Sequence, residues 1–467
     1  MTVTSTALLA QADPPTLADF GSDPIWLVIA KAIAMFVFLL VMTIFVIWFE
    51  RRIVAFMQQR VGPNRAGPFG ILQTLADGFK LAFKEGIKPR LADVAVYIIA
   101  PLAAAIPAIL AWAVIPLGPT VSIFGTETPL QVADLPVAVL FVLAMAAIGV
   151  YGVVLSGWSS GSTYSLLGSM RGSAQVISYE IGMGLAVVGV VLYAGSLSTS
   201  EIVAAQTDGW YLIVLPVSFV LFWIAGLGET NRAPFDMPEG ESEIVGGFHT
   251  EYSSLRFAMF FLGEYIALIT IAAMSTTLFL GGWLPFWPFS MFEWAYEGWI
   301  PVIWFILKVL AGVFFFIWAR ASLPRFKYDR FMVFGWKVMI PVGLGWVMIV
   351  ASARVLVPEY LSIAQYVLFI GVPLLALLLL GTVVHDRGKA RRATALEQEV
   401  LREPSFPVPP LDLVVPRSHA ARRTAAGSVE GTARETTVMP FEASTEPPPP
   451  AEVDEADGPD DGEAPRV

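Results

Sequence analysis

The sequence predicts an all-α membrane protein with about nine transmembrane helices and an amphipathic helix at the membrane surface. Hydrophobic residues make up 56% of the 467 residues and charged residues only 15%, which is far more apolar than a soluble domain. The apolar residues are gathered in runs long enough to cross about 30 Å of hydrocarbon as a helix, which takes roughly 20 residues. No run alternates with period two over the length of a barrel strand, so helices are favoured over a β-barrel.

Nine apolar runs define the expected transmembrane helices. In chain order they are 26–49, 94–116, 136–156, 174–194, 210–227, 255–280, 300–319, 332–355 and 360–384. Lys and Arg indicate the orientation, because cytoplasmic linkers carry an excess of these residues. They occur in or at the edges of the linkers near 50–93, 157–173, 228–254 and 320–331. They are absent from the linkers 117–135, 195–209, 281–299 and 356–359. We therefore expect the N-terminus outside and the C-terminus in the cytoplasm.

The two ends of the chain differ from the helical membrane domain, which we assign to 25–384. Residues 1–24 contain no Lys or Arg, so we expect an extracytoplasmic N-terminus without a cleaved signal peptide, and a first helix that acts as the insertion signal. Residues 385–467 are first basic, then rich in proline, then acidic, with nine acids between Glu442 and Glu463. Such a segment buries too little apolar surface to fold alone, so it predicts a disordered cytoplasmic tail.

The chain contains no cysteine and only three histidines. The lack of cysteine excludes thiolate-bound iron-sulfur clusters, c-type haem attachment and disulfides within the chain. Two of the histidines, His385 and His419, lie at or beyond the end of the last run, so no bis-His haem can form inside the bundle. If the protein takes part in redox chemistry, its electrons must come from a partner.

The linker after the first run predicts a surface helix. In ILQTLADGFKLAFKEGIKPR, residues 71–90, the apolar residues recur at helical spacing, and Asp77, Lys80 and Lys84 interrupt them. This pattern is typical of an amphipathic helix that lies on the membrane. A basic anchor for anionic lipid explains the same residues equally well.

The linker after the fifth run is the most unusual segment. Together with Glu229, the string TNRAPFDMPEGESEIVGGFHTE at 230–251 places six acids within 23 residues, and only Arg232 and His249 can offset them. Carboxylates next to hydrocarbon are costly, so they indicate a functional site. Repulsion among Glu239 and its acidic neighbours at 241 and 243 should raise some of their pKa values. For His249 we favour a hydrogen-bonded structural residue over a proton shuttle.

Acids also occur within the runs. Glu264 lies nine residues into the sixth run, about 13 Å deep at roughly 1.5 Å per residue. At that depth an acid should face the protein interior or a water-filled cavity. We expect Lys308 to be its countercharge, and an adjacent arginine, Arg51 or Arg52, to pair with Glu50 at the end of the first run. Either pair could serve only to fix helix packing.

Four strings resemble members of the H-subunit family of the proton-pumping NADH-quinone oxidoreductase, respiratory complex I. In order they are ERRIVAFMQQRVGPNRAGPFGILQTLADGFKLAFKE, RGSAQVISYE, ETNRAPFDMPEGESEIVGGFHTEYSSLRFAMFFLGEYIA and WARASLPRFKYDRFM, one in each predicted cytoplasmic linker. The resemblance covers about residues 25–384 and not the tail. It implies a membrane subunit that joins the hydrophilic redox arm to the membrane arm and forms much of a quinone-binding chamber. NADH, flavin and the clusters would belong to other subunits.

The resemblance also implies roles for individual residues. Those along the chamber or at its mouth would be Glu50, Arg51, Gln58, Arg60 and Asp77. A proton or charge relay toward the pumping subunits would comprise Glu180, Glu229, Asp236, Glu239, Glu241, Glu243, Glu264 and Lys308. A docking surface would contain Arg65, Arg232, Arg320 and Arg325. For the arginines, a solvated anchor that orients the helices is the alternative.

The substrate implied is a quinone, either ubiquinone or menaquinone. We expect no catalytic residue, metal, flavin, haem or iron-sulfur cluster on this chain and no complete redox activity from it alone. The expected partners are other complex I subunits and the lipid of a bacterial-type plasma membrane, without nucleic acid.

Two other classes of protein compete with this interpretation. A secondary transporter usually shows two related halves, and the sequence shows no internal repeat. The equivalent subunit of a membrane-anchored hydrogenase would share the fold and many motifs, but the complete ERR, ADG and PEGESE strings favour the quinone enzyme. Co-purification with soluble subunits that show NADH-quinone activity would separate these classes.

Overall fold

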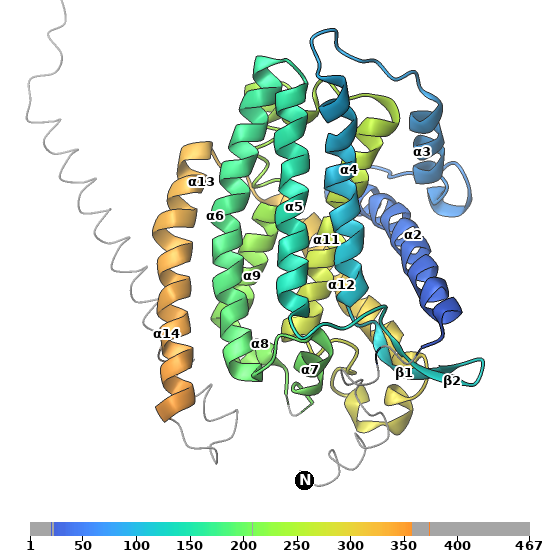
Figure 1. The fold of residues 1–467 in the computed structure, drawn as a ribbon, viewed down its shortest axis with the longest axis vertical. Helices are drawn as coiled ribbons and strands as arrows, with labels where there is room; N and C mark the ends of the chain where they lie inside the picture. The colour runs from blue at the N-terminus through green and yellow to red at the C-terminus, as the bar shows by residue number, and fades with distance from the viewer. Residues whose placement is uncertain (1–19, 21–22, 208, 357–372, 374–467) are drawn as a thin grey trace, which may run out of the picture. The chain divides into compact units, whose positions relative to one another are not determined.

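A computed structural model describes residue 20 and residues 23–207, 209–356 and 373 of the chain (Figure 1). Within these residues the protein is mostly helical, and seven helices are long and apolar enough to cross a membrane. The all-α membrane class is therefore confirmed. The ninth predicted helix at 360–384, apart from residue 373, and the tail at 385–467 lie outside the described residues.

The long helices follow the predicted apolar runs. They are α2 (Ile25–Met57), α4 (Val94–Leu110) with its extension η3 (Ala111–Val114), α5 (Ala138–Ser159), α6 (Thr163–Ala194), α11 (Ser254–Phe279), α12 (Ile300–Ser322) and the series α13 (Tyr328–Phe334), η7 (Gly335–Met339) and α14 (Ile340–Leu356). The predicted run at 210–227 is instead split into α8 (Tyr211–Val214) and α9 (Pro216–Glu229). Pro216 causes the break, because it has no N–H to donate and restricts the residue before it.

Short elements occupy the linkers. On one side of the bundle these are η2 (Pro68–Gly70), α3 (Gln73–Phe83), α10 (Glu241–Ile244) and η4 (Gly247–His249). On the other they are α7 (Thr199–Ala204), η5 (Phe289–Met291), η6 (Glu293–Tyr296) and an antiparallel hairpin of β1 (Gly118–Ile123) and β2 (Thr126–Leu130). Helix α3 confirms the helix predicted in the first linker, whereas the hairpin was not predicted.

Helix α6 begins at Thr163, 11 residues before the predicted start at 174, so the expected linker at 157–173 is mostly helical. Small residues explain both why the start of α6 was misplaced and how this part of the helix packs. They lower the hydropathy of this segment, and they let the acidic linker approach the helix. A Cβ on Gly168 would lie 2.8 Å from the oxygen of Pro238, and one on Gly172 would lie 2.9 Å from the ring of Pro238.

The four linkers that carry Lys and Arg meet at one end of the bundle (Figure 1). The backbone N–H of Ile87 donates to Ser253 Oγ at 2.8 Å, and that of Phe326 donates to the oxygen of Pro234 at 3.2 Å. We call this end, formed by residues 58–93, 160–162, 230–253 and 323–327, the linker end. The hairpin, α7 and the segment 280–299 lie at the opposite end. The structure thus groups the linkers as the alternation of charge predicts.

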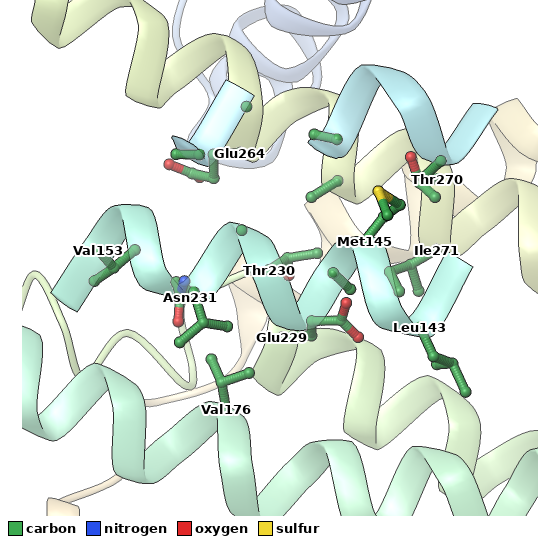
Figure 2. A pocket seen from close by; sticks show the side chains of 18 of the residues that line it. Leu143, Met145, Val153, Val176, Glu229, Thr230, Asn231, Glu264, Thr270 and Ile271 are labelled. Carbon is green, nitrogen blue, oxygen red and sulfur yellow. The ribbon is translucent and has the colours of Figure 1, made fainter. Parts of the chain in front are cut away.

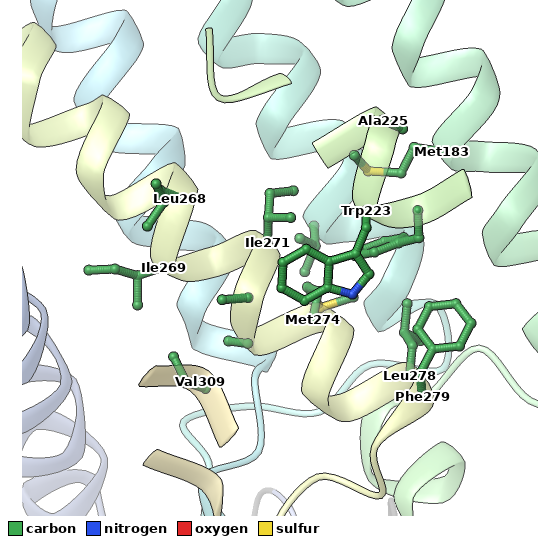
Figure 3. Packing of buried hydrophobic residues seen from close by; sticks show 14 of the residues in the cluster. Met183, Trp223, Ala225, Leu268, Ile269, Ile271, Met274, Leu278, Phe279 and Val309 are labelled. Carbon is green, nitrogen blue, oxygen red and sulfur yellow. The ribbon is translucent and has the colours of Figure 1, made fainter. Parts of the chain in front are cut away.

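Helix α11 lies in the centre of the bundle, and its second half is buried on all sides. Figure 3 shows the indole of Trp223 on α9 lying beside Ile271 and Met274 of α11. The same indole stacks on Phe316 of α12 with ring centroids 4.8 Å apart. A helix that is apolar all round belongs in the core. Because α11 also carries Glu264 and Tyr265 nearer its start, the core fixes the position of these polar groups.

Candidate functional site

A cluster of paired charges lies where α2, α11, α12 and the acidic linker meet. Glu50 accepts hydrogen bonds from Arg232 Nη1 at 2.9 Å, from Arg320 Nη1 at 2.5 Å and from the hydroxyl of Tyr265 at 2.9 Å. Arg232 Nε donates to Glu264 Oε1 at 2.6 Å. We call these five residues the charge cluster. It combines two carboxyls with two guanidiniums, which lets charges stay buried because each is paired.

Arg232 links the two acids of the charge cluster. Its side chain is 4% exposed, and its guanidinium carbon lies 4.0 Å from the centre of the Tyr265 ring. Burial by itself would lower the pKa of Arg232, but the carboxylates of Glu50 and Glu264 raise it above its ordinary value. The guanidinium is therefore charged, and it holds α2 and α11 to the acidic linker. The prediction that Arg232 forms part of a docking surface is wrong, because the residue lies inside the bundle.

The predicted pairing of Glu50 with Arg51 or Arg52 is also wrong. Successive residues of an α-helix point roughly 100° apart, so Glu50 faces the bundle while Arg51 faces α3. Arg51 forms an ion pair of 2.5 Å with Asp77 of α3. Arg52 donates to the backbone oxygen of Pro63 at 3.2 Å. Glu50 instead binds arginines that are 182 and 270 residues away in sequence, and only tertiary structure brings these to it.

Lys308 does not contact Glu264, so that predicted pair is wrong as well. Helices α11 and α12 run in opposite directions, and each residue lies in the first half of its own helix. The two side chains therefore lie at different ends of the bundle. The ammonium of Lys308 donates to the backbone oxygens of Leu280, Gly282 and Leu284 at 2.5, 3.0 and 2.6 Å. It thereby satisfies carbonyls at and just beyond the carboxyl end of α11.

The acidic linker supplies a second group of carboxyls beside the charge cluster. Asp236 is buried and pairs with Arg325 at 3.0 Å. Burial, with the nearby carboxyls of Glu264 and Asp236, raises the pKa of Glu239 to about 9. His249 Nδ1 lies 3.7 Å from Glu239 Oε1. At neutral pH Glu239 therefore carries a proton.

Among the described residues, the causes of this pKa shift differ from the predicted one. Glu239 was expected to respond to its sequence neighbours at 241 and 243. Glu243 instead turns to Arg171 of α6, with which it forms an ion pair, and its side chain is 47% exposed. The side chain of Glu241 lies outside the described residues. Burial, followed by Glu264 and Asp236, replaces the predicted repulsion as the main cause.

A cavity of about 120 Å³ extends from the acidic linker into the bundle between α4, α5, α6, α9 and α11 (Figure 2). Three carboxyls line it, those of Glu229, Glu239 and Glu264. Glu229 Oε2 is buried and has no hydrogen-bond partner among the described residues. Glu180 on α6 interacts electrostatically with Glu229 but does not line the cavity. A cavity of this size is large enough for several water molecules, and water beside its three carboxyls would connect them.

The remaining predicted site residues lie on the outside of the linker end. Arg60 Nε donates to Gln58 Oε1 at 2.7 Å, and both residues are exposed, as is Arg65. The side chains of Arg320 and Arg325 are 45% and 44% exposed although each pairs with a buried acid. Most of the predicted residues therefore fall into an outer group around α3 or an inner group formed by the charge cluster, the buried acids of the linker and the cavity. Lys308 belongs to neither.

Sequence reasoning did not identify Tyr265 or Gln175. Gln175 Nε2 donates to the backbone oxygens of Gly228 and Phe235 at 2.5 and 2.7 Å and so holds the start of the acidic linker against α6. A glutamine inside an apolar run was the available signal. Among the described residues, no group of three or more His, Cys, Asp or Glu side chains could hold a metal ion.

Comparisons with known proteins identify the family of this chain. A family model described as NADH dehydrogenase matches residues 30–351. The NADH-quinone oxidoreductase H subunit of Frankia casuarinae is 57% identical over 399 residues, which cover 85% of this chain and 88% of that protein. The H subunit of Frankia alni is 55% identical over 404 residues, with coverage of 86% and 89%. That of Streptomyces avermitilis is 54% identical over 404 residues, with coverage of 85% and 89%.

Proposed function

The chain belongs to the H-subunit family of NADH-quinone oxidoreductase and is a membrane subunit of complex I, and we propose that it forms much of the quinone-binding chamber and couples quinone reduction to proton translocation. One observation carries the proposal. The buried Glu50, seven residues before the end of α2, is connected through Arg232 to Glu264, which shares a cavity with Glu239 and Glu229.

The proposed chamber lies between α2 and α3. The Arg51–Asp77 ion pair joins these helices, and α3 leaves the rings of Phe79 and Phe83 exposed. A quinone has a long apolar tail and a polar headgroup, so its site needs an apolar passage that ends at groups able to donate hydrogen bonds. The exposed face of α3 suits the tail, and Arg51 suits the headgroup. Gln58 and Arg60 would then stand at the mouth.

The proposed relay begins at the charge cluster. A negative charge that forms beside Glu50 would compete with it for Arg320 and Arg232, because guanidiniums are strong partners for anions. It would also favour the protonated form of Glu239, whose pKa already lies near 9. Protons would enter at the linker end and pass through water in the cavity to Glu229. Glu180 would be the next acceptor.

Membership of the family implies other complex I subunits as partners. We propose that the hydrophilic arm docks at the linker end, where Arg65 and Arg325 present exposed guanidinium groups, and that this end faces the cytoplasm of a bacterial-type plasma membrane. The N-terminus would then lie outside. The other membrane subunits would take over the proton path beyond Glu180. Residues 1–24 would then be an extracytoplasmic segment and residues 385–467 a cytoplasmic tail.

A substitution of Glu229 tests the relay. Glu229→Gln keeps the shape of the side chain and removes its ability to exchange a proton. In the assembled complex we expect at least a tenfold loss of NADH oxidation by quinone, about 1.4 kcal/mol in the barrier, with NADH oxidation by an artificial acceptor retained. Glu127→Gln in the exposed hairpin is the matched control and should change neither rate. Normal quinone-linked turnover in Glu229→Gln would refute the proposal.

A further inference from the structure

The cavity lining is mostly apolar, and its carboxyls are not spread evenly along it. Figure 2 shows Glu264 and Asn231 with Val153 toward one end, Met145 and Ile271 with Thr270 toward the other, and Glu229 between them. The apolar end continues along small and flexible side chains of α4, α5 and α11, which include Ala108, Ala146 and Met274. A pocket that combines an apolar wall with a few polar groups at one end is the usual form of a site for an organic ligand.

Among the described residues, the ionisable side chains that line the cavity are all acids. Three carboxyls line it, and no lysine, arginine or histidine among the described residues does so. Glu264 is paired from outside the lining by Arg232, but Glu229 Oε2 is buried without a hydrogen-bond partner within the described part of the chain. A buried carboxyl oxygen without a donor is costly, so a ligand that brings an N–H donor and a positive charge gains most here.

We propose that this cavity binds an organic monocation with a short apolar tail, such as a primary alkylammonium. The ammonium would donate to Glu229, and the tail would lie against Ala108, Met145 and Met274. An anion would find no basic side chain in the lining among the described residues. A hydrated metal ion would not suit an apolar wall, because hard cations require oxygen ligands on most sides. The site is separate from the proposed quinone chamber, which lies between α2 and α3.

Binding at this site does not depend on the proposed relay, although an occupied cavity would block proton movement past Glu229 if that relay exists. The same carboxyl would then serve two ligands, a proton in turnover and an ammonium in the inhibited state. Binding and turnover can therefore be measured separately, and the failure of one proposal leaves the other standing.

Photolabelling of the assembled complex tests the site. The probe is a short-chain alkylamine with a diazirine at the end of its tail, and the alcohol of the same length and the same diazirine is the uncharged control. We expect the amine to label cavity residues of α4, α5 or α11 at least about tenfold more strongly than the alcohol does. A factor of this size corresponds to the affinity gained from one charged hydrogen bond. An excess of the amine without the diazirine should abolish this labelling.

Two variants make the result specific. Ala146→Phe fills the apolar end and should remove the labelling, whereas Ile148→Phe on the exposed face of the same helix should not. If Ala146→Phe does not assemble, Glu229→Gln provides the same test, because it removes the negative charge and should reduce labelling to the level of the alcohol. Equal labelling by amine and alcohol, or labelling confined to residues outside the cavity lining, would overturn the proposal.

Discussion

Loss of Arg232 should destabilise the protein chiefly through Glu264. Arg232→Gln removes one of the partners of Glu50, which keeps Arg320 and the hydroxyl of Tyr265. Glu264 has no other ion pair within the described residues. Breaking a buried ion pair by removing one partner costs about 3–5 kcal/mol. A stranded carboxyl can instead take up a proton, and for a glutamate of ordinary pKa this costs about 3.7 kcal/mol at pH 7. Both values give a loss of about 3–4 kcal/mol in the free energy of unfolding.

The assay is thermal unfolding of the assembled complex, followed by the release of subunits. Arg232→Gln should lower the midpoint by roughly 5 °C or more. Adding Glu264→Gln should recover most of this loss, because the stranded charge is gone. Adding Glu50→Gln should not, because Glu50 still has two partners. The reasoning is refuted if the Arg232→Gln midpoint equals that of the unmodified protein, or if both double variants recover equally.

Three further predictions concern other parts of the site. Gly168→Ala should push the acidic linker away from α6 at Pro238, lower the free energy of unfolding by about 1–3 kcal/mol and reduce quinone-linked turnover. Gly184→Ala is the control, because no neighbouring atom lies within 4 Å of the new Cβ, and it should be neutral or stabilising in the same thermal assay. Because the pKa of Glu239 is raised, the folded protein binds the proton of this carboxyl more tightly than the unfolded chain does. The stability gained from the bound proton should be fully present below about pH 4.5 and be lost as the pH rises to about 9. Glu239→Gln should flatten that decline and remove a protonated-carboxyl infrared band that titrates near pH 9, and an unchanged band would count against the assignment. Lys308→Met should leave three carbonyls without their donor and lower the unfolding temperature, while the KM for quinone stays the same. A raised KM would contradict the placement of Lys308 outside the inner group.

The fold could be predicted because the bilayer limits what a chain can do. The length of the apolar runs predicted the long helices, and the positions of Lys and Arg predicted correctly which linkers lie at the same end of the bundle. The start of α6 was misplaced because Gly168 and Gly172 lower its hydropathy, although they are there for close packing against Pro238. The break at Pro216 in the fifth run could have been read from the sequence, since proline disrupts a helix interior.

The sequence predicted which carboxyls belong to the site but not which residues they pair with. Every inner carboxyl was named from the sequence, because an acid near hydrocarbon is rare. The partners were sought among near neighbours in sequence or at similar positions along a helix. This paired Arg51 or Arg52 with Glu50 and Lys308 with Glu264. The actual partners, Arg232 and Arg320, come from other segments, and only the packing of α2, α11 and α12 brings them together.

Proton pumping by the reconstituted complex tests the central claim most directly. The rate of NADH oxidation by quinone and the protons translocated during it should both be measured in proteoliposomes that contain either the unmodified complex or Glu264→Gln, with Glu127→Gln as the control. Because Glu264 is the carboxyl that joins the charge cluster to the cavity, we predict that Glu264→Gln loses pumping together with quinone-linked turnover and keeps NADH oxidation by an artificial acceptor. Full turnover with an unchanged proton ratio in Glu264→Gln would contradict the claim that these carboxyls couple quinone reduction to proton translocation.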